Sequence, residues 1–254
     1  MCLILVVWRV HPDYPWILAA NRDEYRHRPA AAAAWWEDAP HILAGRDLLA
    51  GGTWLGVNRA GAFAALTNFR GAPVRPPPTP SRGELVAGLL DRRRTVAEEL
   101  RALERTGSHY NAFNLLFSDG ERLGVYESER RAGRVLAPGL YGLSNHLLDT
   151  PWPKVLKAKS RLAAALEDLP RTQRILDLLR DTEPAADEEL PRTGVSLEWE
   201  RLLSSAFIRS TEYGTRCSTV ITRSRTGTID FGEWSWDRAG APAGQVAWRF
   251  TVDR

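Results

Sequence analysis

Lysine and cysteine are both scarce in this chain of 254 residues. Lysine occurs only at positions 154, 157 and 159, and arginine supplies the other basic side chains. The formal net charge is only +3, and no run of basic residues is long enough to follow a phosphate backbone. We therefore expect no nucleic acid partner.

Cys2 and Cys217 are the only cysteines, which leaves no disulfide framework and no paired cysteine spacing of the zinc type. The five histidines are scattered, without the His-x₃-His spacing of a metal site. Glycine-rich loops that bind nucleotide phosphates are absent, as is the Gly-x-Ser-x-Gly turn of serine hydrolases. We expect neither a metal nor an organic cofactor.

Long hydrophobic runs are also missing. The apolar run at residues 3–8 is too short for the core of a signal peptide and far too short to span a bilayer. With 44% hydrophobic and 26% charged residues, the composition is that of a globular protein, and no linker divides the chain. We expect a single domain over residues 1–254 and a cytoplasmic location. Nothing in the sequence indicates an oligomeric state.

The pattern of apolar residues predicts strands at both ends of the chain and helices between them. A β-prone run at 3–10, a proline turn at 11–15 and a second run at 16–20 predict an N-terminal hairpin. Further strands are predicted in three pairs of segments, 53–57 with 62–66, 113–117 with 122–126 and 135–136 with 140–143. Three more strands are predicted near the end of the chain, at 218–222, 228–234 and 245–252.

Helix start signals fall in the middle of the chain. Ser81–Glu84 and Thr95–Glu98 both fit the capping box, and Thr150 followed by proline fits a third helix start. Shorter helices are expected at 172–180 and 197–206, while residues 29–34 fit either a helix start or a linker. This order favours a layered α+β domain over a parallel βαβ fold.

Cys2 is the first candidate for chemistry. If Met1 is removed, Cys2 carries both a thiol and a free α-amine, and the amine can act as the base that activates the thiol. The alternative is that Cys2 is a small hydrophobic residue at the start of a buried strand.

The cluster Asn21-Arg22-Asp23-Glu24 follows the second strand, where the hairpin returns the chain to Cys2. Asp23 could orient the amine, and Arg22 could favour the thiolate or bind a substrate carboxylate. The alternative is a solvated turn with a structural ion pair.

Asn68 and Asn145 each end an apolar strand, which suits an amide donor to an oxyanion or an ordinary strand-end cap. Arg216 precedes a β-prone run and could face the same cleft, and Trp54 could line it.

These motifs together resemble the NRDE family, also called the transport and Golgi organisation protein 2 family. The residues that carry the resemblance run from 1 to about 222: Met1-Cys2, Ala20–Glu24, Gly45-Arg46-Asp47, Gly51–Gly56, Leu66-Thr67-Asn68, Ser81–Val86, Tyr141–Asn145 and Tyr213–Val220.

The family is similar to N-terminal-nucleophile (Ntn) hydrolases, which implies a four-layer αββα sandwich of two mostly antiparallel sheets. Comparison with N-terminal-cysteine amidases implies Cys2 as nucleophile, Asp23 as orienting residue, and Asn68 and Asn145 in the oxyanion hole. Arg22, Arg216 and Trp54 are the expected substrate-binding residues. The arginine that precedes the aspartate in those amidases has no clear equivalent here.

The resemblance implies two functions. The first is hydrolysis of a non-peptide C–N amide bond of a small acyl-amide through a Cys2 thioester. The second is non-catalytic binding or trafficking on the same fold, with haem or an acyl group as the ligand.

Overall fold

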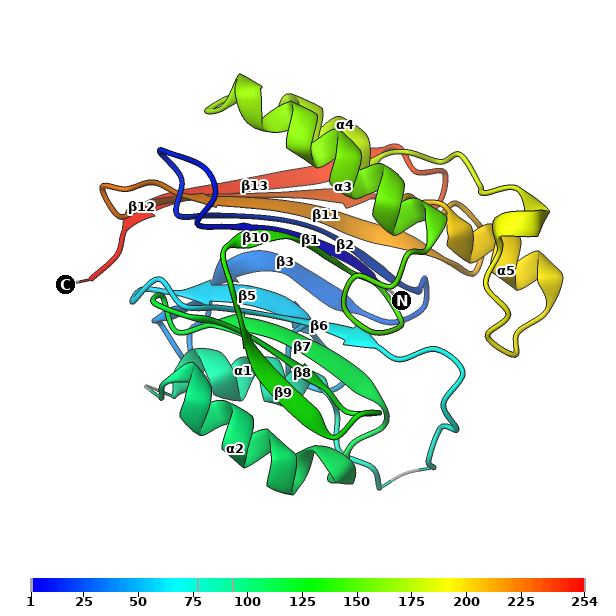
Figure 1. Cartoon of the computed structure of the whole chain (residues 1–254), viewed down its shortest axis with the longest axis horizontal. Coiled ribbons are helices and arrows are strands. Elements are labelled where there is room, and N and C mark those ends of the chain that lie inside the picture. The colour runs from blue at the N-terminus through cyan, green and yellow to red at the C-terminus, as the bar shows by residue number, and fades with distance from the viewer. Residues whose placement is uncertain (1, 77, 93, 254) are drawn as a thin grey trace.

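The computed structural model describes residues 2–76, 78–92 and 94–253, and two stacked sheets lie between two layers of helices (Figure 1). Every strand pairing among these residues is antiparallel. The expected removal of Met1 concerns a residue outside the described ranges. No helix in the described part of the chain is long and apolar enough to cross a membrane.

The first sheet has six strands and contains the N-terminal hairpin. Its order is β10-β1-β2-β11-β12-β13. The bounds are β1 Cys2–Trp8, β2 Trp16–Tyr25, β10 Gly139–Leu143, β11 Tyr213–Arg223, β12 Thr228–Trp236 and β13 Pro242–Thr251.

The second sheet is a seven-stranded meander in sequence order, β3 to β9. Its bounds are β3 Ala30–Trp35, β4 Ile42–Asp47, β5 Leu55–Asn58, β6 Phe63–Asn68, β7 Phe113–Ser118, β8 Leu123–Glu127 and β9 Ala132–Leu136. The segment 140–143, expected next to 135–136, instead crosses to the first sheet as β10 and pairs with β1.

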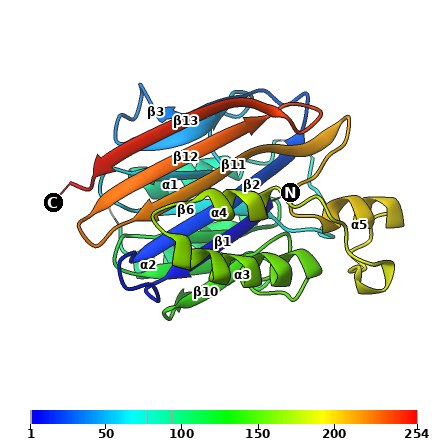
Figure 2. The same cartoon turned by 90° about the horizontal axis from the view of Figure 1, so that it is seen from above.

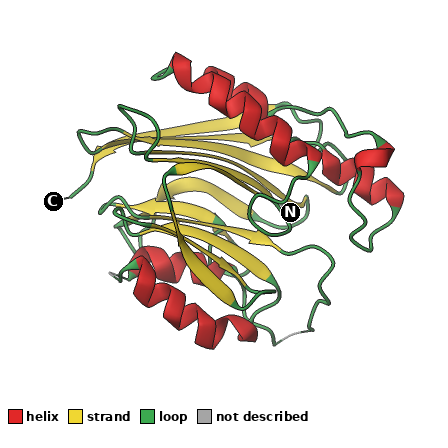
Figure 3. Ribbon diagram, in the orientation of Figure 1, coloured by secondary structure: helices red, strands yellow, loops and turns green. Residues whose placement is uncertain are grey.

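Each sheet has one face covered by helices (Figures 2 and 3). α3 (Pro153–Ala165) and α4 (Gln173–Leu179) cover the first sheet, and α1 (Gly83–Asp91) and α2 (Val96–Thr106) cover the second. α5 (Leu197–Ser204) lies at one end of the first sheet. Short 3₁₀ turns span Gly107–His109, Leu166–Asp168 and Asp187–Glu189.

Alternation along β1 builds two of the three large cores. Ile4, Val6 and Trp8 face the space between the sheets, whereas Leu3, Leu5 and Val7 pack against α3 and α4. Because both faces of β1 are buried, the strand is apolar at every position after Cys2. A third core lies between the second sheet and α1 and α2. The four-layer αββα sandwich predicted from the resemblance is confirmed.

Two local predictions need correction. The alanine run that fits a helix start or linker is strand β3, since pairing with β4 and burial of Ala33 override the helical preference of alanine. Asn21–Glu24 does not follow the second strand but lies within it, because β2 continues to Tyr25 alongside β11.

The helix starts differ in a similar way. Thr95 forms the predicted capping box with Glu98, but α1 begins after Arg82 without a side-chain cap, so the Ser81 capping box is wrong. α3 is capped at Trp152 with Pro153 in its first turn, later than Thr150.

We expect Thr95→Ala to lower the free energy of unfolding by about 1 kcal/mol, because it removes the bond that the Thr95 hydroxyl accepts from the Glu98 nitrogen and the bond that it donates to the Glu98 carboxylate. Ser81→Ala is the matched control, with an expected loss below about 0.5 kcal/mol. Urea unfolding followed by circular dichroism measures both. An equal loss at the two sites would contradict the observed helix starts.

Candidate active site

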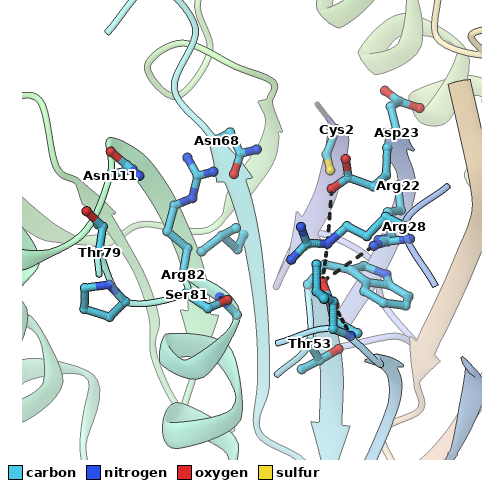
Figure 4. A pocket seen from close by; sticks show the side chains of 17 residues that line it. Cys2, Arg22, Asp23, Arg28, Thr53, Asn68, Thr79, Ser81, Arg82 and Asn111 are labelled. Atoms are coloured by element: carbon cyan, nitrogen blue, oxygen red, sulfur yellow. Dashed lines mark hydrogen bonds and ion pairs between the residues drawn. The ribbon is translucent and has the colours of Figure 1, made fainter. Parts of the chain in front are cut away.

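A pocket of about 430 Å³ lies between the two sheets at the end where β1 begins (Figure 4). Cys2, Arg22 and Asp23 line it from the first sheet, and Asn68 lines it from the second. The segment before α1 supplies a further side with Arg82. The volume is within the roughly 300–1,000 Å³ that small-molecule sites occupy.

Strand register places Cys2 in this pocket. Cys2 pairs with Arg22, which in turn pairs with Cys217 on β11, so the three residues form one row across the sheet. Cys2 lies two positions before Ile4 and therefore faces the space between the sheets, as Ile4 does. The thiol thus points to the open end of the between-sheet core.

Asn145 holds the start of β1 in place. The backbone nitrogen of Cys2 donates to Asn145 Oδ1 (3.3 Å), and the Ser144 hydroxyl donates to the Cys2 carbonyl (3.0 Å). The amide nitrogen of Asn145 donates to the Asn68 carbonyl at 2.8 Å. One fully buried side chain therefore joins the first strand of one sheet to the second sheet.

Asp23 follows Arg22 on β2, and it is buried on the face of the first sheet that the helices cover. Its Oδ1 accepts from the Thr215 hydroxyl (2.7 Å), and its carbonyl accepts from Tyr213 (3.0 Å). Burial raises the pKa of the Asp23 carboxyl, while Lys154, the Thr215 bond and Arg70 oppose that rise. Lys154 is itself buried and donates to the Leu203 carbonyl (2.9 Å), and burial lowers its pKa to about 8.

Cys2 is half-buried, and its thiol lies in the pocket. Burial raises its pKa, and the Asp23 charge adds to the rise. A hydrogen bond from the Asp23 backbone and the Arg22 guanidinium act in the opposite direction. Because the net direction is upward, the thiol needs a nearby base to become a nucleophile near neutral pH.

Arg22 is 5% exposed and lies over the Trp54 ring, with its guanidinium carbon 4.1 Å from the ring centroid. A Cβ at Gly45 would come within 2.4 Å of the Trp54 ring, so only glycine allows this approach. The nearest carboxylate to Arg22 is Asp47, at 3.9 Å. Arg28 binds the same oxygen of Asp47 at 2.6 Å, so Arg22 has the weaker share of that charge.

The structure brings together Cys2, Arg22, Asp23, Trp54 and Asn68 from the residues expected in the site. Asn145 lies beside Cys2 but does not line the pocket, and its amide nitrogen donates one of its two hydrogens to the Asn68 carbonyl. Its contacts fit the positioning of the Cys2 nitrogen better than donation to an oxyanion.

Arg216 does not reach the pocket. A bulge in β11 between Thr215 and Cys217 turns it away, and its Nη1 donates to the carbonyls of Tyr25 (2.9 Å), Arg26 (3.4 Å) and Arg28 (3.0 Å). It holds the turn after β2.

Sequence reasoning missed Lys154, Thr215 and Arg82. Thr215 and Arg82 lie inside motifs that carry the family resemblance, but nothing in the sequence pattern distinguishes them from their neighbours. Lys154 gives no signal, since only the packing of α3 on β10 and β1 brings it toward Asp23. Among the described residues, no group of three His, Cys, Asp or Glu side chains could hold a metal ion.

A model of the family described as Transport and Golgi organisation 2 matches residues 1–238. The chain belongs to this family. The family's Bos taurus homologue, Transport and Golgi organization protein 2 homolog, is 38% identical over 92% of this chain and 93% of its own length. The Homo sapiens homologue is 34% identical over the same shares of each chain.

One solved structure shows that this family member shares its fold with Ntn hydrolases. A mutant conjugated bile acid hydrolase from Clostridium perfringens aligns over 98% of this chain and 92% of its own, with a TM-score of 0.55. The sequence identity is 10%, so the likeness is one of fold.

We expect the stability of the wild type relative to Lys154→Met to increase between about pH 8 and pH 10.5. The Lys154 pKa is lowered to about 8 on folding from 10.5, so the unfolded chain binds more protons in this window and stability rises with pH. The gain is on the order of 3 kcal/mol.

Urea unfolding of both proteins at pH 7.5, 9 and 10.5 measures this difference. Lys157→Met is the control, because Lys157 is an exposed lysine on the same helix whose ion pairs raise its pKa. If the stability of the wild type relative to Lys154→Met fell as the pH rises, the Lys154 ammonium would not be desolvated on folding.

Proposed function

We propose that the chain is an N-terminal-cysteine hydrolase that cleaves a non-peptide C–N amide bond of a small acyl-amide through a thioester on Cys2. The observation that carries this proposal is the position of Cys2. Its thiol lines the pocket, and its backbone nitrogen donates a hydrogen bond to Asn145 Oδ1. The buried Asp23 carboxylate is close enough to raise the pKa of the thiol.

The nucleophile requires removal of Met1, which converts the Cys2 nitrogen into an amine. The amine takes the thiol proton, and the sulfur attacks the amide carbonyl carbon. When the tetrahedral intermediate collapses, the C–N bond breaks and the amine passes the proton to the leaving nitrogen. Water then attacks the thioester, giving a carboxylic acid and restoring the thiol.

The surrounding residues support this sequence of steps. The Asn145 oxygen accepts from the Cys2 nitrogen, and Asp23 supplies negative charge that favours the protonated amine. The Asn68 side chain lines the pocket from the facing sheet and is the oxyanion donor in this proposal. Arg22 opposes the burial cost of the thiolate.

The alternative is a non-catalytic carrier of haem or an acyl ligand. The arginines of the pocket would suit the carboxylates of such ligands as well as those of a substrate. No histidine of the described residues lines the pocket, so an iron ligand would come from Cys2.

We expect Cys2→Ala to abolish hydrolysis of a panel of short acyl-amides, with a loss of about 10³-fold or more in kcat/KM. Cys217→Ala is the control, because it removes the other cysteine, which is buried and outside the pocket. Intact-protein mass spectrometry measures Met1 removal and, after rapid acid quench, an acyl adduct that we expect in the wild type and in Cys217→Ala but not in Cys2→Ala.

Retained Met1 in protein from its own host, or a wild type without Met1 that hydrolyses no amide, would overturn the hydrolase. In the second case, haem or acyl-ligand binding that survives Cys2→Ala, measured by absorbance titration, would support the carrier.

A further inference from the structure

Two guanidinium groups face the pocket from opposite sides. Arg22 extends from β2 of the first sheet, and Arg82 extends from the start of α1, across the pocket from Cys2 (Figure 4). The Arg22 charge lowers the pKa of the Cys2 thiol, and the charge of Cys2 raises the pKa of Arg82, so both guanidinium groups lie close enough to the nucleophile to influence it. These two charges are available to a ligand only where no carboxylate of the protein neutralises them.

Arg82 is not neutralised by a direct partner. Among the described residues it forms one hydrogen bond, from Nη1 to the Ala112 carbonyl (3.0 Å), and it has no ion pair with a carboxylate there, since Glu24 and Asp47 pair with Arg28. Burial lowers the pKa of its guanidinium, and the charges of Glu24 and Cys2 only partly offset this. A guanidinium has five N–H donors, so most of its donors remain available on the pocket side.

Three acids line the pocket, Asp23, Glu24 and Asp47, and Asp23 accepts from the Thr215 hydroxyl. The other two also have partners away from Arg22 and Arg82. Asp47 binds Arg28 through one oxygen and accepts from the backbone nitrogens of Leu49 and Ala50 through the other. Glu24 accepts from the Tyr25 nitrogen (2.8 Å) and lies 3.9 Å from Arg28. These contacts hold Glu24 to β2 and Asp47 to β4, and they leave Arg22 and Arg82 facing the pocket.

We propose that Arg82, with Arg22, forms a subsite for an anionic group, and that the substrates are acyl-amides that bear a carboxylate near the scissile bond. This inference rests on the hydrolase function proposed above, since it names the substrate class of the same pocket. Planar guanidinium groups bind carboxylates through two parallel hydrogen bonds, which fixes the orientation of the ligand as well as its charge.

The rest of the lining defines the complementary part of the substrate. Leu49, Leu66 and Pro80 are apolar, and the Trp54 ring lies beneath Arg22. Together with the volume of about 430 Å³, this lining fits a short apolar acyl chain attached to a charged amine component. An N-acyl amino acid has this form.

The test compares N-octanoylglycine with N-octanoylglycinamide, which have the same acyl chain and scissile bond but differ in charge. We expect the wild type to favour the carboxylate by at least about 10-fold in kcat/KM. Arg82→Met should reduce this selectivity by about 10-fold, mainly through KM, and Arg82→Lys should retain part of it. The selectivity of Arg249→Met, an exposed arginine on β13, should match the wild type.

Binding separates this inference from the hydrolase proposal. Calorimetry of N-octanoylglycine with Cys2→Ala and with Cys2→Ala/Arg82→Met needs no turnover, and we expect the second affinity to be at least about 10-fold weaker. Binding that depends on Arg82 without any hydrolysis would overturn the hydrolase and leave the subsite. Hydrolysis of both amides at equal rates, unaffected by Arg82→Met, would overturn the subsite and leave the hydrolase.

Discussion

The pairing of β1 with β2 determines the chemistry available at this end of the molecule. In the observed register Cys2 lies opposite Arg22, and Asp23 is directed to the other face of the same strand. A shift of one residue would exchange the two faces, placing the thiol under the helices and the apolar residues of β1 on the wrong sides. Burial of both faces of β1 prevents that shift, so packing and catalytic geometry depend on one alignment.

Charge at the site is stabilised by contacts from several layers. Asp23 has Thr215 and Tyr213 on β11 and Lys154 on α3, while the buried Arg70–Glu200 ion pair links the second sheet to α5. Isolated buried charges are costly, whereas charges with fixed partners can be retained. Asn145 contributes in the same way without charge, because its amide satisfies groups of both sheets at once.

The sequence predicts the repeated features of the fold better than the single contacts of the site. Apolar periodicity identifies most strands, and the family resemblance supplies the four layers and three of the residues that line the pocket, Cys2, Asp23 and Asn68, while the chemistry of the side chains suggests Arg22 and Trp54. The pattern does not show that β2 continues through Asn21–Glu24, because pairing with β11 decides this. Nor does it show that a bulge removes Arg216 from the site or that α3 carries Lys154 toward Asp23, since both follow from tertiary packing.

All three lysines lie on α3, and this has a practical consequence for chemical labelling. Apart from the amine at the start of the chain, reagents that acylate primary amines can modify only this helix, and Lys154 is shielded there. Lys157 and Lys159 are the accessible positions, both in ion pairs on the outer layer. Dyes or cross-linkers attached through them would report on the helix layer while leaving the guanidinium groups of the pocket unmodified.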